Sequence, residues 1–192
     1  MPCLVLDAMG VIFEAADDVG ELLIPFIVEN SPTCDEAFIQ AAYLDVSLGS
    51  TSPDEFWNQV GVPANLEDEF LSRHALKAGV VELLVWCRDN KIPVWCLSND
   101  VGRWSQKLRV RLNIEAYLQG SIISGDVGLR KPDRKIYVAL IEASGFPVEQ
   151  LLFVDDREAN VLAARELGIE SILHDPRAGF AEARRWLSQR AN

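Results

Sequence analysis

The chain has 192 residues, of which 49% are hydrophobic and 24% are charged, a composition typical of folded globular proteins and not of disordered ones. Its 18 lysines and arginines against 29 aspartates and glutamates give a formal net charge of −11. This charge repels nucleic acids and anionic membrane surfaces, so we expect neither as a partner. An anionic ligand would need a positive group close to it.

The sequence shows no leader-like segment at its start and no apolar run long enough to span a membrane. Its four cysteines show no CxxC spacing and no dense framework: Cys3, Cys34, Cys87 and Cys96. We therefore expect reduced thiols and a cytoplasmic protein, with no metal–thiolate site.

Five short apolar segments are predicted to be strands. They cover residues 3–7, 93–98, 120–123, 151–155 and 170–173. Helical periodicity follows two of them, over residues 133–145 and 158–168, and each of these patterns stops at a glycine. Alternating strands and helices predict a parallel sheet that is covered on both faces.

One interval contains only helical patterns, directly after the first strand. The predicted helices cover residues 18–30, 34–47, 53–60 and 65–77, and a crossover helix over 79–90 leads to the second strand. We therefore predict an α/β core made of residues 1–13 and 79–192. Residues 14–78, which we call the insert, are predicted to form a small helical cap over the carboxyl edge of the sheet.

Four predicted strand or loop ends carry polar residues. Asp7 ends the first strand, and Ser98 and Asn99 end the second. Hydroxyl and amide groups can donate hydrogen bonds to an oxyanion, although both residue types are also common in ordinary turns. Lys131 follows a glycine-containing turn and precedes a proline, which favours an extended backbone before it. Its ammonium group could neutralise a phosphate.

The fourth segment places Asp155 and Asp156 at the end of an apolar strand, with Asn160 four residues after Asp156. Two adjacent buried carboxylates repel each other unless a cation lies between them. Oxygen-only ligands favour Mg²⁺. Capping of the following helix by Asp156 is an alternative role that is compatible with metal binding.

Together these segments resemble the motifs of the haloacid dehalogenase superfamily, whose members are mostly Mg²⁺-dependent phosphohydrolases with an aspartate nucleophile. The resemblance covers the first strand, Ser98-Asn99, residues 121–173 and the position of the insert, which resembles the small helical cap of subfamily I. In motif detail the chain most resembles bacterial glucose-1-phosphatases and the amino-terminal phosphatase domains of epoxide hydrolases. The resemblance implies a Rossmann-like, three-layer parallel sheet with strand order 3-2-1-4-5.

The resemblance also implies roles for particular residues. Asp7 would attack phosphorus and form an aspartyl-phosphate that water then cleaves. The implied Mg²⁺ ligands are Asp7, the Met9 carbonyl, Asp155 and Asp156. The implied phosphate-binding residues are Ser98, Asn99 and Lys131, with Lys131 also catalytic and Asn160 supporting the site. The expected partner is a small phosphorylated substrate, and the expected assembly is a monomer or a homodimer.

Met9 departs from the family pattern, which usually has a second aspartate two residues after the nucleophile. Because methionine has no titratable proton, it cannot give the general acid–base help that is typically worth about 10²- to 10⁴-fold in rate. Three hypotheses follow. The chain is a phosphatase whose substrate has a good leaving group, or a 2-haloacid dehalogenase, or a slow or inactive relative that binds a phosphorylated ligand or a protein.

The insert should select the substrate, and five of its side chains could face the cleft: Tyr43, Asp45, Phe56, Trp57 and His74. Aromatic residues at helical spacing are more often part of a core, and His74 has no partner at metal-ligand spacing, so we expect it at the surface.

Overall fold

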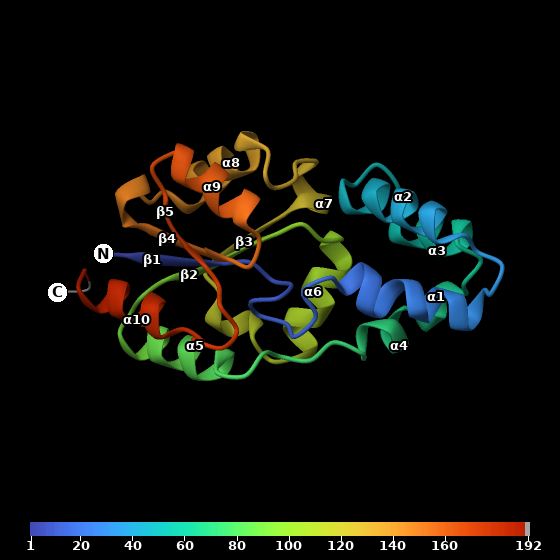
Figure 1. The fold of residues 1–192 in the computed structure, drawn as a ribbon, viewed down its shortest axis with the longest axis horizontal. Coiled ribbons are helices and arrows are strands. Elements are labelled where there is room, and N and C mark those ends of the chain that lie inside the picture. Colours follow the sequence, from blue (N-terminus) through green and yellow to red (C-terminus); the bar gives the residue numbers. More distant parts are fainter. Residues whose placement is uncertain (191–192) are drawn as a thin grey trace.

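The computed structural model describes residues 1–190 and contains one five-stranded parallel sheet with helices on both of its faces (Figure 1). The strands are β1 (Cys3–Leu6), β2 (Val94–Ser98), β3 (Gly120–Ile123), β4 (Leu151–Asp155) and β5 (Glu170–Leu173). Their order is β3-β2-β1-β4-β5, so the predicted Rossmann-like fold and strand order are confirmed.

The register of the central strands brings the polar strand ends together. Leu6 lies opposite Cys96 on one side and Val154 on the other. The chain then continues through Asp7, whose backbone N–H donates to the Val154 carbonyl at 2.9 Å. Asp7 therefore leaves the sheet beside Asp155, at the carboxyl edge where open α/β sheets bind ligands.

Two layers of helices cover the sheet (Figure 1). One face carries α5 (Val80–Asp89), α6 (Gly102–Arg111) and α10 (Ala181–Ser188), and the other carries α8 (Arg134–Ser144) and α9 (Glu158–Glu166). The three central strands, β1, β2 and β4, are wholly buried because both faces of the sheet are covered, which explains their apolar runs, whereas the edge strands β3 and β5 are partly exposed. A short helix, α7 (Ser124–Val127), follows β3, and 3₁₀ turns occupy Glu115–Tyr117 and Val148–Gln150.

The insert lies at the carboxyl ends of the strands, on the right in Figure 1. It begins with a π-helical turn (Val19–Leu23) and continues through α1 (Ile24–Asn30), α2 (Glu36–Ser47) and α3 (Pro53–Gln59). A 3₁₀ turn (Ala64–Leu66) then precedes α4 (Glu67–Leu71). The hydroxyl of Ser52 and the carboxylate of Glu55 form a reciprocal capping box at the start of α3.

One predicted helix is shorter than expected. The helix predicted over residues 65–77 ends at Leu71, because the chain must return from the insert to the core. The returning segment of chain pairs with the outgoing one: Glu14 N–H donates to the Ala75 carbonyl at 3.0 Å and Lys77 N–H to the Ile12 carbonyl at 2.9 Å. These backbone bonds replace the helical ones that Ala75 and Lys77 would otherwise make.

The cysteines are free, with Cys3, Cys87 and Cys96 buried. Within residues 1–190, no helix combines the length and the apolarity that a membrane crossing requires.

Candidate active site

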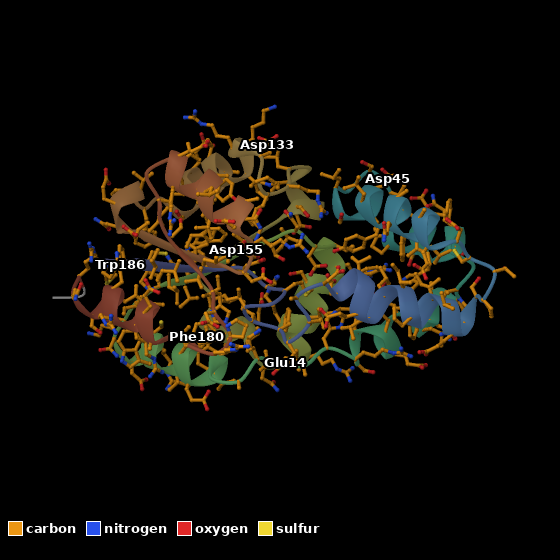
Figure 2. The ribbon with its side chains drawn as sticks, in the orientation of Figure 1. Glu14, Asp45, Asp133, Asp155, Phe180 and Trp186 are labelled. Atoms are coloured by element: carbon orange, nitrogen blue, oxygen red, sulfur yellow. The ribbon has the colours of Figure 1, made fainter. Side chains whose placement is uncertain are left out.

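The four polar segments line one cavity of about 390 Å³ between the sheet edge and the insert. Asp7, Met9, Ser98, Asn99, Lys131 and Asn160 belong to its wall. The insert supplies Ala16, Asp17, Asp18, Val19, Gln40, Tyr43 and Leu44. Figure 2 places Asp155 at the end of β4, near the middle of the molecule and on the side of the sheet that faces the insert. The topology therefore converts four distant sequence segments into one site.

Lys131 joins the two central carboxylates. Its Nζ lies 2.7 Å from Asp7 Oδ1 and 2.7 Å from Asp155 Oδ2, and it also donates to the Leu97 carbonyl at 2.7 Å. All three ammonium protons therefore have acceptors. The two carboxylates raise the pKa of Lys131 above its usual range although burial opposes them, so the lysine stays protonated.

Asp155 is fully buried, and both of its carboxylate oxygens accept hydrogen bonds. Oδ1 accepts from the Arg157 backbone N–H at 2.8 Å and from Asn160 Nδ2 at 3.0 Å. Oδ2 accepts from Lys131 Nζ at 2.7 Å. These bonds fix the carboxylate in place, and through it the positions of Lys131 and Asn160.

Asp156 differs from its neighbour. It is half-buried, and its Oδ1 atom is buried without a hydrogen-bond partner among the described residues. Burial and the charge of Asp155 raise the pKa of its carboxyl group. A buried acceptor without a donor is costly, so this oxygen is well suited to a cation.

The three acids fit a divalent cation together. Asp7, Asp155 and Asp156 can each offer an oxygen such that all three atoms lie within 4.8 Å of one another. Burial raises the pKa of Asp7 to about 8, with Lys131 opposing the effect and Asp155 and Asp156 adding to it. One lysine thus fails to balance three carboxylates, and a divalent cation would remove the excess negative charge.

Gly10 allows Asp156 to approach the first loop. Its φ is +72°, and a Cβ atom built on it would lie 2.1 Å from Asp156 Oδ2. Any side chain here would therefore strain the backbone and displace the carboxylate.

Ser98 and Asn99 are placed differently although they are adjacent. Ser98 is fully buried, and its Oγ lacks a hydrogen-bond partner within residues 1–190. The Asn99 side chain instead pairs with the backbone of Lys131: Nδ2 donates to the carbonyl at 2.9 Å, and Oδ1 accepts from the N–H at 2.8 Å. Ser98 is therefore available to a ligand, whereas the side chain of Asn99 holds the lysine loop.

Asp18, Arg130 and Arg157 also line the cavity, and they were not among the residues predicted from the sequence. Arg130 directly precedes Lys131 and hydrogen-bonds to Ser47 of α2, so it links the core to the insert. Its position in the lysine motif was the only local signal for it. Asp18 belongs to an Asp-Asp pair that is typical of an ordinary helix start, so no local pattern marks it.

The five side chains of the insert that could face the cleft lie in different environments. Tyr43 lines the cavity, and its hydroxyl donates to the Asn99 carbonyl at 3.5 Å. Phe56 and Trp57 are buried in an aromatic core, and Asp45 is exposed on the outer side of α2 (Figure 2). The surface position expected for His74 is wrong, because the ring packs edge-on against Phe13 and Phe70 with only 6% of the residue exposed.

The burial of Asp18 makes the stability of the fold depend on pH. Burial and the neighbouring Asp17 raise its pKa from 3.8 to about 6, although the Val19 amide and Arg157 oppose the shift. The folded state therefore holds this proton more tightly than the unfolded state, and ionisation destabilises the fold. This destabilisation is absent at pH values below the pKa of Asp18 in the unfolded chain, and it reaches its full size above about pH 6.

We predict that the stability difference between the Asp18→Asn variant and the wild type grows by roughly 3 kcal/mol between about pH 4 and pH 8, in favour of the variant. Urea unfolding at a series of pH values measures this difference. Parallel pH curves for the two proteins would contradict the prediction.

Comparison with known proteins agrees with this geometry. A family model described as haloacid dehalogenase-like hydrolase matches residues 8–168. The phosphoglycolate phosphatase of Pseudomonas fluorescens is 30% identical over 95 residues, which cover 49% of this chain and 35% of that protein. The GMP/IMP nucleotidase of Escherichia coli is 35% identical over 71 residues, which cover 36% of this chain and 32% of that protein. The chain thus spans about a third of the length of these curated relatives.

Solved structures share the fold at low sequence identity. One is a haloacid dehalogenase family enzyme of Bacteroides thetaiotaomicron in complex with magnesium and inorganic phosphate. It is 21% identical with a TM-score of 0.78, over 95% of this chain and 98% of that one. The L-2-haloacid dehalogenase of Xanthobacter autotrophicus, with chloropropionic acid covalently bound, is 16% identical with a TM-score of 0.62, over 89% of this chain and 76% of that one. From the extent of the family match and the agreement in fold, we conclude that this chain belongs to the haloacid dehalogenase-like hydrolase family.

Proposed function

We propose that the chain is a Mg²⁺-dependent phosphatase that hydrolyses a small phosphorylated metabolite through an aspartyl-phosphate on Asp7. The observation that carries this proposal is that Asp7 and Lys131 line one cavity, that Lys131 contacts both Asp7 and Asp155, and that Asp7, Asp155 and Asp156 can offer oxygens close together. Phosphoryl transfer depends chiefly on positioning and on neutralisation of charge, and this arrangement offers both.

The proposed cation ligands are Asp7, Asp155, Asp156 and the Met9 carbonyl. A bound Mg²⁺ would supply positive charge to the phosphoryl oxygens and would relieve the repulsion among the acids. Asp156 is the acid best suited to bind directly, since its Oδ1 has no hydrogen-bond partner among the described residues. Both oxygens of Asp155 already accept hydrogen bonds, so this acid is less suited to bind the cation directly and better suited to position Lys131.

The proposed nucleophile is the Oδ2 atom of Asp7. Its Oδ1 atom accepts from the Ala8 N–H at 2.6 Å and lies 2.7 Å from Lys131 Nζ, so one oxygen is held and the other stays available. The Ser98 hydroxyl and the lysine are the proposed donors to the transferring phosphoryl group, with the loop of Asn99 beside them. A phosphoryl oxygen would take one of the three positions around the Lys131 ammonium group that protein oxygens now fill.

The insert is proposed to act as a cap that closes the site and restricts the substrate. It supplies about half of the cavity wall, and the cavity volume of about 390 Å³ suits a small metabolite. Arg130 and Arg157 at the wall favour an anionic substrate despite the net charge of the chain. The named activities of the two curated relatives also concern small phosphorylated compounds. The cytoplasmic location, which the free thiols support, and the monomeric or homodimeric state belong to the same proposal.

Hydrolysis of p-nitrophenyl phosphate by the full chain tests the function. We expect turnover with Mg²⁺ and its loss in EDTA, with recovery when Mg²⁺ is restored in excess. The same protein should release no halide from 2-chloropropionate in EDTA, and halide release there would instead favour the dehalogenase hypothesis. A silent wild type that the Met9→Asp substitution activates would overturn the proposal and favour a binding role.

A further inference from the structure

Asp18 reaches the cavity of the candidate active site from the insert. It directly precedes the π-helical turn at residue 19, and its residue is only 7% exposed. Its side chain lines the same cavity as Asp7 and Met9. It makes no side-chain capping bond to the turn that follows it, and no ion pair of the described residues includes it. A buried carboxyl group on a cavity wall that neither caps a helix nor joins an ion pair is a candidate for chemistry.

The charged groups around Asp18 come from both parts of the molecule. Asp17 is its neighbour in the insert, Arg157 follows β4, and Asp100 and Tyr43 lie on the β2 loop and on α2. Burial is the largest influence and raises the pKa of Asp18 to about 6. A carboxyl group in this range can hold a proton and release it near neutral pH.

The other groups of the cavity are less suited to moving a proton. Burial raises the pKa of Tyr43 well above its usual value of 10. The ammonium protons of Lys131 are all donated to protein oxygens, and guanidinium groups do not deprotonate. Met9 has no ionisable proton. Asp17 is exposed and accepts the backbone N–H of Gly20 at 3.3 Å.

We propose that Asp18 is the general acid and base of this site, acting from the insert; the proposal rests on the proposed phosphatase function. As Asp7 Oδ2 bonds to phosphorus, the bond from phosphorus to the ester oxygen breaks. That oxygen keeps the electron pair and takes the proton of the Asp18 carboxyl group, and the alcohol leaves. Asp18, now ionised, takes a proton from water as the water oxygen attacks phosphorus. The bond between phosphorus and Asp7 breaks, its electron pair returns to Asp7, and phosphate is released.

A comparison of leaving groups tests the acid role. Ethyl phosphate releases a strongly basic alkoxide that needs a proton, whereas p-nitrophenyl phosphate releases a stable phenolate that does not. We expect Asp18→Asn to lower kcat/KM for ethyl phosphate by about 10²- to 10⁴-fold, and to lower kcat/KM for p-nitrophenyl phosphate by less than about tenfold. The ratio kcat/KM is the appropriate quantity because it reports the steps up to release of the alcohol.

The base role has its own signature. Without Asp18 the hydrolysis of the aspartyl-phosphate slows. The Asp18→Asn variant should therefore show a burst of p-nitrophenolate and should accumulate phosphorylated protein, which acid quench detects. Absence of this burst in a variant that still cleaves p-nitrophenyl phosphate would remove the base role.

Asp17→Asn is the matched control, since it neutralises the adjacent acid on the same loop. We expect it to lower kcat/KM for both substrates by the same small factor. Asp18→Ser is a second variant that removes the proton donor and keeps a polar side chain before the helical turn. Like Asp18→Asn, it should lower kcat/KM for ethyl phosphate much more than kcat/KM for p-nitrophenyl phosphate. Asp18→Glu retains a carboxyl group and should recover part of the activity on ethyl phosphate.

The outcomes separate the two proposals. An equal fall for both substrates in Asp18→Asn would overturn the role of Asp18 and leave the phosphatase proposal standing. A wild type that hydrolyses aryl phosphates and fails on ethyl phosphate would also overturn it. A wild type that hydrolyses neither substrate with Mg²⁺ would overturn both proposals.

Discussion

The Asp7→Asn variant is expected to lose p-nitrophenyl phosphatase activity, with kcat lower by about 10⁴- to 10⁶-fold, the scale seen when a covalent nucleophile is removed. An amide oxygen is a far weaker nucleophile than a carboxylate oxygen, and it forms no stable acyl phosphate. The substitution preserves the shape of the side chain, so the amide oxygen of the variant can still accept from the Ala8 N–H, a bond of 2.6 Å in the wild type.

The control for this variant must separate chemistry from folding. Circular dichroism should show a native spectrum for Asp7→Asn, and acid quench during turnover should find phosphate bound to the wild type and none bound to the variant. Residual activity within about tenfold of the wild type would show that another residue attacks phosphorus.

The Glu67→Ala variant is expected to lower the free energy of unfolding by about 4 kcal/mol. Glu67 begins α4 of the insert, and its side chain is 4% exposed. Its Oε2 atom accepts from Trp57 Nε1 at 3.0 Å, from Trp104 Nε1 at 2.7 Å and from the Arg103 guanidinium at 2.5 Å. Its Oε1 atom accepts from Lys107 Nζ at 2.7 Å. Alanine would leave two buried indole N–H groups without an acceptor.

The same carboxylate joins the insert to the core, because Arg103, Trp104 and Lys107 belong to α6. Burial alone would raise the pKa of Glu67, but the hydrogen bonds from Lys107, Arg103 and the two indoles hold it below its usual range. The cationic partners are partly exposed and can regain water, so most of the expected loss comes from the indoles and from the vacated volume.

Urea unfolding monitored by tryptophan fluorescence measures the effect, with Glu69→Ala as the control on the exposed side of the same helix. Glu67→Gln, which keeps one acceptor oxygen, should lose less stability than Glu67→Ala. A loss below about 1 kcal/mol for Glu67→Ala, comparable to the control, would show that this cluster adds little to stability.

The sequence predicted the sheet closely, since the observed strands match the predicted ones within one residue at each end. Buried parallel strands need uninterrupted apolar residues, and that requirement is local and visible. The helix α6 is harder to recognise because its buried face includes Arg109 and Ser105. The Arg109 guanidinium donates to Glu115 and Ser105, both at 2.6 Å, so only the tertiary contacts make that burial acceptable.

In the candidate site, too, some features could be predicted from the sequence and others depend on tertiary contacts. Motif spacing selected Asp7, Ser98, Lys131 and Asp156, because each follows or ends a segment whose place is fixed by topology. Spacing could not show that the Asn99 side chain holds the lysine loop. Nor could it show that Asp155 is saturated with hydrogen bonds, while Asp156 keeps an oxygen without a partner in residues 1–190. These distinctions depend on side-chain directions, which sequence patterns do not report.

The sequence by itself determined the strands, the parallel sheet and the loops that carry the polar residues, because hydrophobic period and strand ends are properties of short segments. The order of the strands was implied by the resemblance to a known family. Only the tertiary structure decided that Asp18 enters the cavity and that Glu67 ties the insert to α6. Both roles arise from burial among groups that are distant in sequence. Desolvation and charge act through space, so the protonation and the energy of a carboxyl group are fixed only when its packed neighbours are known.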